Sequence, residues 1–348
     1  MFLKPEARQI FVDLDYGAKA CNRLQNDNRD DEFLVSRLIF LTTYGTSVDL
    51  GTLITQHQLA ETVVENLARY ARRNAGTSGK AKADPIEGMA LAETLKLLFN
   101  LTNFAPKHVD LFAPAIPHII AILGEHDVPA TSTPLEPPIG LLINALMNLQ
   151  LDSKEARPSF YPENEPTSIS NKLIRLLDAA MKAYEDGELE QAVSPLVCVI
   201  RSVYEHAPEK IRQHIAGKLL PTEDDRRNIL GRGDTLSASL LQSMTNPLAP
   251  QLGDSISHLL FDMSDKDASK FVNNVSYGFA SGFLFKNDIP VPVTEAEEAE
   301  ISSTGDSKKE FNPITGQYLD EEKHPELPEM TDEEKEREAE RLFVLFER

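Results

Sequence analysis

The chain has 348 residues, a hydrophobic fraction of 41% and a formal net charge of −20 at pH 7. This composition allows a large buried core, but the charge argues against nucleic acid and anionic membranes as partners, because both require a basic surface. The two cysteines, Cys21 and Cys198, provide neither a disulfide framework nor zinc-ligand spacing and fit a reducing compartment. A signal-peptide pattern and an apolar run of the roughly 18 residues that a membrane span needs are both missing, so a cytoplasmic location is expected.

Apolar residues recur at helical spacing from about residue 5 to residue 287. In LAETLKLLFNLTNF (91–104), Leu91, Leu95 and Leu98 fall on one face, and a second apolar row predicts a helix buried between neighbours. Alternating β-branched runs bounded by turn residues are lacking. An all-α fold is therefore predicted, interrupted by two polar loops, 72–85 and 151–170, that are expected to be mobile.

A short motif recurs in five of the predicted helices. It begins with a basic or polar residue in most copies, continues with an apolar pair and places a polar residue within an apolar helix. The copies are RLIFLTT (37–43), KLLFNLT (96–102), NALMNLQ (144–150), PLVCVIRS (195–202) and HLLFDMS (258–264). Helical repeats at periods of roughly 50 to 60 residues predict an armadillo/HEAT-like α-solenoid. A compact helical domain is the alternative, because any leucine-rich helical core yields similar heptapeptides.

The excess negative charge is concentrated near the C-terminus. Residues 294–348 hold 18 acidic and 7 basic side chains, and such a segment is disordered or only conditionally ordered. We therefore expect an armadillo-like helical repeat domain over residues 1–290 and an acidic tail over residues 291–348. The tail contains an NPITG turn and ends in a short helix.

Signatures of enzymes fail one by one. The segment GRGDTL (231–236) breaks the dinucleotide-binding pattern at its last position, and no G-x-S-x-G or H-E-x-x-H motif occurs. The eight histidines are scattered without an i, i+4 pair. The sequence therefore predicts a binding protein that is not an enzyme and needs no cofactor or metal.

Several segments resemble the synembryn family. They are ETLKLLFNLT, KLLPTEDDRRNILGRGDTLSASLLQSMT, ISHLLFDMSDKDASKFVNNVSYGFASGFLF and, above all, FNPITG followed by PEMTDEEKEREAERLFVLFER. The resemblance covers nearly the whole chain, whose acidic, divergent style is similar to that of a fungal member. Family members carry further repeats ahead of the matching segment, so the chain is expected to lack the first repeats.

The resemblance implies a right-handed superhelix that serves as a chaperone and guanine-nucleotide exchange factor for heterotrimeric G-protein α subunits (Gα). It implies that a groove grips the C-terminal helix of GDP-bound Gα, releases GDP and stabilises the nucleotide-free state. The protein would be a cytoplasmic monomer that Gα can recruit to the cell cortex. By this resemblance and by repeat position, the groove residues are Arg37, Phe40, Phe99, Asn100, Asn144 and Asn148.

Within this implied groove, Phe99 would pack on the apolar side of the Gα helix and Asn100 would offer its amide. Arg37 could hold the carboxylate at the Gα C-terminus. Core packing or backbone capping is an equally open interpretation for each of these side chains.

The tail has two further expected roles. The turn residues Asn312 and Pro313 and the apolar face of Leu342, Phe343 and Phe346 are expected to strap Gα from outside the groove. The flank of the solenoid and its last repeat are the alternative binding surfaces for the apolar face of this helix.

An acidophilic kinase is expected to phosphorylate Ser302, Ser303 or Thr304. The added phosphate would dock on a cluster of arginines, for which Arg226, Arg227 and Arg232 are the candidates.

Other functional classes stay open at this stage, the last of them an enzyme with an unrecognised site. One is a non-exchanging armadillo adaptor that binds linear peptides, although the chain has no Trp for the ladder typical of import adaptors. Another is a structural scaffold whose acidic tail acts as a solubiliser. Acceleration of GDP release from Gα would separate an exchange factor from these classes.

Overall fold

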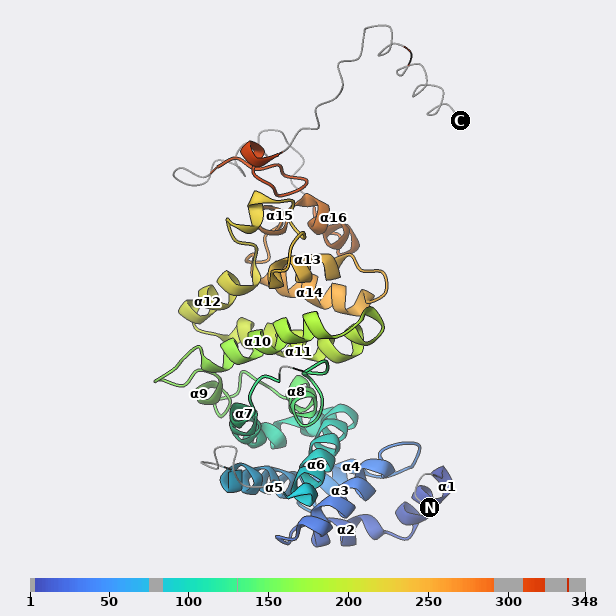
Figure 1. Cartoon of the computed structure of the whole chain (residues 1–348). Coiled ribbons are helices and arrows are strands. Elements are labelled where there is room, and N and C mark those ends of the chain that lie inside the picture. Colours follow the sequence, from blue (N-terminus) through green and yellow to red (C-terminus); the bar gives the residue numbers. More distant parts are fainter. Residues whose placement is uncertain (1–3, 75–83, 130, 291–308, 323–336, 338–348) are drawn as a thin grey trace.

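The structure, a computed structural model, describes residues 4–74, 84–129, 131–290, 309–322 and 337. Its helices stack into an elongated column with α1 near one end and α16 near the other (Figure 1). The lower half contains α1 (Pro5–Asp13), α2 (Tyr16–Leu24), α3 (Arg29–Thr42), α4 (Leu50–Thr55), α5 (Leu59–Asn74), α6 (Pro85–Phe104), η1 (Pro106–Ala115), α7 (Ile116–Glu125) and α8 (Ile139–Met147). The upper half contains α9 (Arg157–Phe160), α10 (Ser168–Ala183), α11 (Asp186–His206), α12 (Glu209–Leu219), η2 (Asp225–Arg227), α13 (Leu236–Met244), α14 (Pro250–Asp262), α15 (Ala268–Val275), α16 (Tyr277–Lys286) and η3 (Leu319–Glu321).

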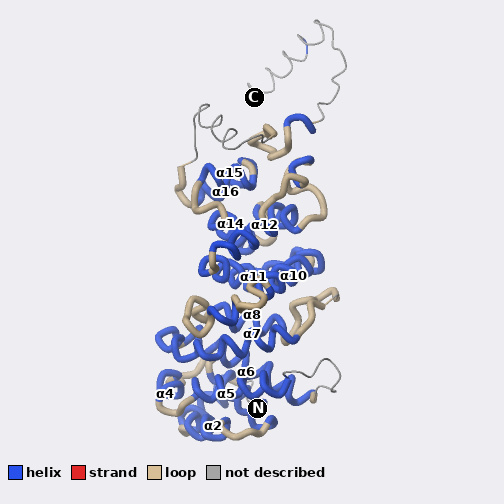
Figure 2. The backbone as a smooth tube through the Cα atoms, turned by 90° about the vertical axis from the view of Figure 1, so that its left-hand side faces the viewer, coloured by secondary structure: helices blue, strands red, loops and turns tan. Residues whose placement is uncertain are grey.

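The helices form two layers along the column. Helices α3, α6, α8, α11 and α14 each contact the next member of this series, and we call them the motif layer. Helices α2, α5, α7, α10 and α13 pack against them pairwise as a second layer. The five sequence motifs fall on the five motif-layer helices, so the spacing of the motifs reflects the stacking of the helices. The predicted all-α solenoid is confirmed, and Figure 2 shows helices and loops throughout the described residues.

Helix α6 shows how the sequence specifies this arrangement. Asp84 caps its N-terminus by accepting a hydrogen bond from the backbone N–H of Ile86 at 3.1 Å, and Pro85 occupies the first turn, where its missing N–H costs nothing. Leu91, Leu95, Leu97, Leu98 and Leu101 are all buried, because α3, α5 and α8 pack around the helix. A helix that is apolar on most of its circumference buries most of its surface between neighbouring helices.

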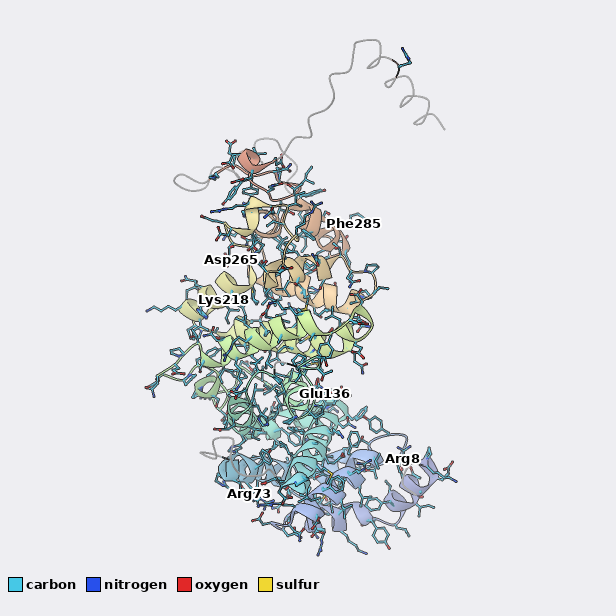
Figure 3. All side chains as sticks on the ribbon, viewed as in Figure 1. Arg8, Arg73, Glu136, Lys218, Asp265 and Phe285 are labelled. Carbon is cyan, nitrogen blue, oxygen red and sulfur yellow. The ribbon has the colours of Figure 1, made fainter. Side chains whose placement is uncertain are left out.

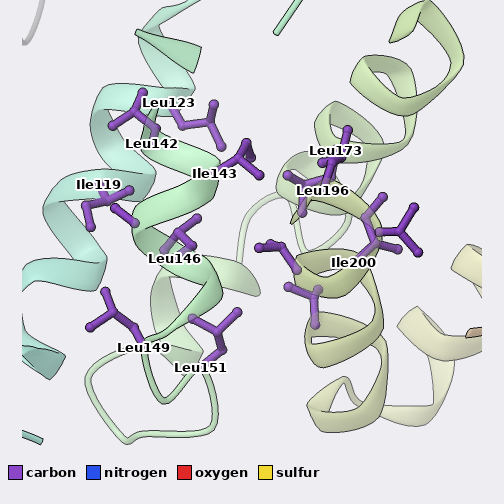
Figure 4. Close-up of a cluster of buried hydrophobic side chains, with 14 of the residues drawn as sticks. Ile119, Leu123, Leu142, Ile143, Leu146, Leu149, Leu151, Leu173, Leu196 and Ile200 are labelled. Carbon is purple, nitrogen blue, oxygen red and sulfur yellow. The ribbon is translucent and has the colours of Figure 1, made fainter. Parts of the chain in front are cut away.

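An apolar seam joins the lower and upper halves between α8 and α11. Leu142, Ile143 and Leu146 of α8 and Leu196 and Ile200 of α11 are all buried in the apolar cluster that Figure 4 shows. Among the described residues no hydrogen bond or ion pair links these two helices. The seam is therefore held by burial and packing of hydrocarbon alone.

The polar segment 151–170 is not the mobile loop that its composition predicts. It contains the short helix α9, and Phe160 is 1% exposed within the core. The hydroxyl of Tyr161 donates a hydrogen bond to the backbone carbonyl of Val203 at 2.5 Å, and burial raises the pKa of this hydroxyl to about 12. A few aromatic anchors outweigh the polar composition, so the prediction of mobility is wrong for this segment. Residues 75–83 of the other predicted loop lie outside the described residues.

Residues 309–322 return to the end of the column and lie beside α15 and α16 (Figure 1). Tyr277 and Leu230 of the helical domain donate backbone hydrogen bonds to this segment. Contact between the helical domain and the expected tail thus extends beyond residue 290. Within the described residues, none of the helices combines the length and apolar character that crossing a membrane would need.

A pair of adjacent substitutions tests the seam. Leu146 is fully buried, so Leu146→Ala should lower the free energy of unfolding by about 2–5 kcal/mol through lost burial and an incompletely filled cavity. The neighbouring Met147 is 38% exposed, and Met147→Ala should cost less than about 1 kcal/mol. Urea denaturation followed by circular dichroism measures both. Equal losses for the two variants would contradict the packing described here.

Candidate partner-binding surface

The fourth residue of each motif forms a row along the motif layer. Phe40 and Phe99 are half-buried, Met147 is partly exposed and Cys198 is exposed. The row ends at α14, where the corresponding Phe261 is packed among other aromatic rings. Four successive helices therefore present a soft apolar side chain at the same motif position, while the apolar pair before it is mostly buried.

Two aromatic residues beyond the motifs widen this row at α3 and α6. The ring of Tyr44 lies edge-on to Phe40, with centroids 5.4 Å apart, and edge-on to Phe104 at 5.9 Å. Tyr44 is 42% exposed and Phe104 is 48% exposed. Neither residue is part of the sequence motif, although Tyr44 follows Phe40 by four positions and its ring contacts that of Phe40. We call the surface of Arg37, Phe40, Tyr44, Phe99, Phe104, Met147 and Cys198 the motif face.

The motif face carries a local excess of positive charge. Nη1 of Arg37 lies 3.4 Å from Oε1 of Glu93, and Nζ of Lys96 lies 2.9 Å from the same oxygen. Glu93 is buried, whereas the side chain of Arg37 is about half exposed. Two cations share one carboxylate, which leaves one positive charge on the surface of a chain whose net charge is −20. Such a site attracts an anionic group of a partner.

The structure places Asn100 beneath the motif face. It is 2% exposed, its Nδ2 donates to Oγ1 of Thr43 at 2.7 Å, and its Oδ1 accepts from the hydroxyl of Tyr44 at 3.3 Å. The amide thus ties α6 to the end of α3 and holds Tyr44 in its exposed position. In the described structure this amide has no free group to offer a partner.

The other two predicted asparagines lie on and just beyond α8. Asn148 is half-buried and donates to the backbone carbonyl of Phe99 and to Oγ1 of Thr102, both at 3.3 Å. Asn144 is half-buried, and its side chain makes no hydrogen bond to the described part of the chain. Asn148 therefore links α8 to α6, while Asn144 keeps an amide available.

A cleft of about 400 Å³ opens at one end of the motif face. Thr43 and Phe104 belong to its wall, and beyond them it is lined by Asp49, Lys107 and His108. The pKa of Asp49 is lowered, chiefly by the hydrogen bond from the hydroxyl of Thr52. Among the described residues no cluster of His, Cys, Asp or Glu could hold a metal ion.

The predicted tail contacts do not join this surface in the described structure. Asn312 and Pro313 lie against α16, several helices away from Arg37 along the column (Figure 1). The backbone carbonyl of Pro313 accepts a hydrogen bond from Tyr277, and the amide of Asn312 donates to Glu322. The remaining tail residues that were singled out lie outside the described residues: Ser302, Ser303, Thr304, Leu342, Phe343 and Phe346.

The expected phosphate dock needs a correction. The guanidinium of Arg226 donates to the backbone carbonyls of Gly316 at 3.2 Å, of Asn274 at 3.3 Å and of Asn273. Both terminal nitrogens of this guanidinium are thus already engaged by backbone carbonyls, so Arg226 is not the free cation that the predicted phosphate dock requires. Arg227 and Arg232 stay exposed.

The role of Asn100 can be tested by stability alone. Asn100→Ala removes a buried amide that satisfies Thr43 and Tyr44, so it should lower the free energy of unfolding by about 1–3 kcal/mol. Asn144→Ala, one repeat further along, is the matched control and should change stability by less than about 0.5 kcal/mol. If both variants unfold at the wild-type denaturant concentration, Asn100 does not tie the helices together.

The two cysteines should react very differently. Cys21 is fully buried and burial raises its pKa to about 12, whereas Cys198 is exposed on the motif face. Because the thiolate is the reactive form, we expect a single thiol to react with Ellman's reagent in the native protein near neutral pH and two in denaturant. Cys198→Ser should abolish the native reaction. Comparable native reactivity of Cys21 would contradict the packing of α2.

Comparisons with known proteins show which family the sequence matches. The sequence model of the family described as guanine nucleotide exchange factor synembryn (Ric8) matches residues 1–348. A synembryn-like chaperone of Schizosaccharomyces pombe is 23% identical over 93% of this chain and 62% of its own length. Chaperone Ric-8A of Bos taurus is 27% identical over 92% of this chain and 62% of its own length.

A third relative, chaperone Ric-8A of Danio rerio, is 26% identical over 98% of this chain and 66% of its own length. The chain thus spans about three fifths of the length of these curated relatives. Because the family match extends over the whole sequence, the chain belongs to the synembryn (Ric8) family of guanine nucleotide exchange factors.

Proposed function

We propose that the chain is a chaperone and guanine-nucleotide exchange factor for G-protein α subunits. The observation that carries this proposal is the family match over all 348 residues. Relatives whose names describe them as chaperones, and the largely apolar motif face, add support. A peptide-binding adaptor would share such a surface, but no feature of the motif face favours it over exchange.

The motif face suits an amphipathic helix that ends in a carboxylate, which is the chemistry of a Gα C-terminus. Phe40, Phe99 and Met147 would receive the apolar side of the helix, and Tyr44 and Phe104 would border it. Arg37 can turn away from Glu93 toward the carboxylate at the end of the Gα helix. The buried charge of Glu93 then stays paired, because Lys96 remains beside it. Asn144 adds one free amide, while Asn100 and Asn148 hold the helices that form the surface.

Exchange by such a protein requires no covalent step. A protein that binds nucleotide-free Gα more tightly than GDP-bound Gα weakens GDP binding by the same factor, typically about 5–150-fold. The same preference protects a labile nucleotide-free fold, which is the chaperone activity. Such a protein would work in the cytoplasm and reach the cell cortex through Gα. Phosphorylation of Ser302, Ser303 or Thr304, and a strap made by Leu342, Phe343 and Phe346, stay predictions.

Nucleotide release from a purified Gα subunit tests the proposal. The chain should accelerate GDP release, and the complex should dissociate when a GTP analogue is added. Arg37→Ala combined with Met147→Ala should reduce the acceleration at least about tenfold, because a charge-assisted contact and an apolar contact are lost together.

The matched control removes an exposed arginine and an exposed apolar side chain outside the motif layer. Arg72 and Leu111 are both exposed, on α5 and η1, so Arg72→Ala combined with Leu111→Ala should leave release unchanged. Loss of activity in both double variants would count against the motif face. Binding of Gα without faster GDP release would point to an adaptor and overturn the exchange function.

A further inference from the structure

Residues 309–322 form a small hairpin, which we call the turn segment. Phe311 and Tyr318 pair across it, and Asn312 and Gly316 close the turn with a backbone hydrogen bond of 2.7 Å. The side-chain oxygen of Asn312 also accepts from the backbone N–H of Ile314 at 2.9 Å. The segment thus has an internal structure that its own residues specify.

The turn segment binds the column largely through backbone groups. Tyr277 and Gly278, in the first turn of α16, donate to the carbonyls of Pro313 at 2.8 Å and Ile314 at 3.3 Å. First-turn N–H groups have no partner within their own helix, and Ser276 provides no side-chain cap. The turn segment therefore acts as the N-terminal cap of α16. On its other side, Leu230 donates to the carbonyl of Thr315 at 3.0 Å.

The surface that receives the turn segment leaves room only for a glycine at position 316. Gly316 has φ +69°, and a Cβ atom built on it would lie 2.4 Å from Cδ1 of Leu230. Leu230 is buried and cannot yield easily. Both the backbone conformation and the lack of space exclude a side chain at this position. The close approach of Gly316 to Leu230 is a feature of a binding site rather than of a loose contact.

Arg226, a residue of η2, holds the turn segment in place through its side chain. Its guanidinium donates to the carbonyl of Gly316 on the turn segment and to those of Asn273 and Asn274 at the end of α15. It also lies 4.5 Å from the centre of the Phe311 ring. In the described part of the chain no carboxylate forms an ion pair with Arg226. Its backbone carbonyl completes the attachment by accepting from Tyr318 at 2.9 Å.

We propose that this end of the column, built from Arg226, Leu230 and Ser276–Gly278, is a binding site for peptides that form an Asn-Pro-x-x-Gly turn after an aromatic residue. Residues 309–322 occupy it in cis, and Arg226 is the latch. The site anchors the C-terminal part of the chain at a fixed point beside α16. This inference does not depend on the proposed function.

The contacts of Arg226 predict how attachment of the turn segment depends on salt concentration. Ion pairs between the acidic C-terminal sequence and exposed arginines would weaken at about 1 M salt, where the Debye length is about 3 Å. Arg226 instead binds neutral backbone carbonyls and the ring of Phe311, and it is largely buried. Salt therefore has no ion pair to screen at this contact. Attachment of the turn segment should therefore withstand high salt.

Hydrogen–deuterium exchange of the full chain tests the latch. Arg226→Ala should speed exchange at residues 309–322 and at the first turn of α16 at least about tenfold, because hydrogen bonds to a charged donor are lost. Arg227→Ala changes the adjacent exposed arginine and should leave exchange there unchanged. Wild-type protection should be the same at low salt and in about 1 M NaCl. Equal protection in the two variants, or its loss in salt, would overturn the proposal.

A second variant tests the site without changing the column. Gly316→Val in the full chain should release the turn segment and expose the amides of Tyr277 and Gly278, while α3 and α6 stay protected. A synthetic peptide of residues 309–322 added in trans should restore that protection. The same peptide with valine at the glycine position should not. Failure of the unmodified peptide to restore protection would show that no peptide-binding site exists here, even if Arg226→Ala unfolds the column.

Discussion

Burial of apolar faces between successive helix pairs is the constraint on which the rest of this structure depends. In a solenoid each repeat contacts only its neighbours, so a pair such as α5 and α6 can bury its leucines only if α3 and α8 lie against it. The stacking fixes which motif positions are covered. The fourth position stays partly open on four helices, so the motif face results from packing rather than from any special local structure.

The sequence was informative wherever a feature is local or periodic. The 3.6-residue spacing of leucines predicted the helices, and the recurring motifs lie on helices that stack in order. Phe40 and Phe99 were implied by the family resemblance, and they also share a motif position. Tyr44 and Phe104 lie just past that pattern and could have been found by extending it one turn. Composition misled at 151–170, where Phe160 and Tyr161 anchor a polar segment in the core.

The remaining features depend on contacts between residues distant in sequence, which no local pattern encodes. Asn100 was a candidate partner contact. Its side-chain amide instead forms hydrogen bonds with Thr43 and Tyr44, which lie more than 50 residues earlier in the sequence. Arg226 looked like part of a basic cluster, but 90 residues separate it from the carbonyl of Gly316 that it binds. A polar side chain has several possible partners, and only the assembled fold decides among them. Surface exposure follows the same rule: Phe285 of α16 is 87% exposed and points outward (Figure 3), whereas Phe283, two residues earlier, is buried.

The seam between α8 and α11 gives the column an uneven stiffness. Arg37 with Glu93 and Asn100 with Thr43 tie α3 to α6 by directional contacts, and Arg201 ties α11 to α14 through Asp262 at 2.5 Å. Between α8 and α11 hydrocarbon alone makes the contact, and dispersion and burial constrain separation far more than angle. Beside this contact, Nζ of Lys172 on α10 donates to the backbone carbonyl of Gly124 on α7 at 2.6 Å, and the backbone N–H of Leu135 donates to the hydroxyl of Tyr184 at 3.1 Å. Directional contacts between the two halves therefore lie beside the motif layer, and α8 and α11 can shift against each other without breaking a hydrogen bond between them.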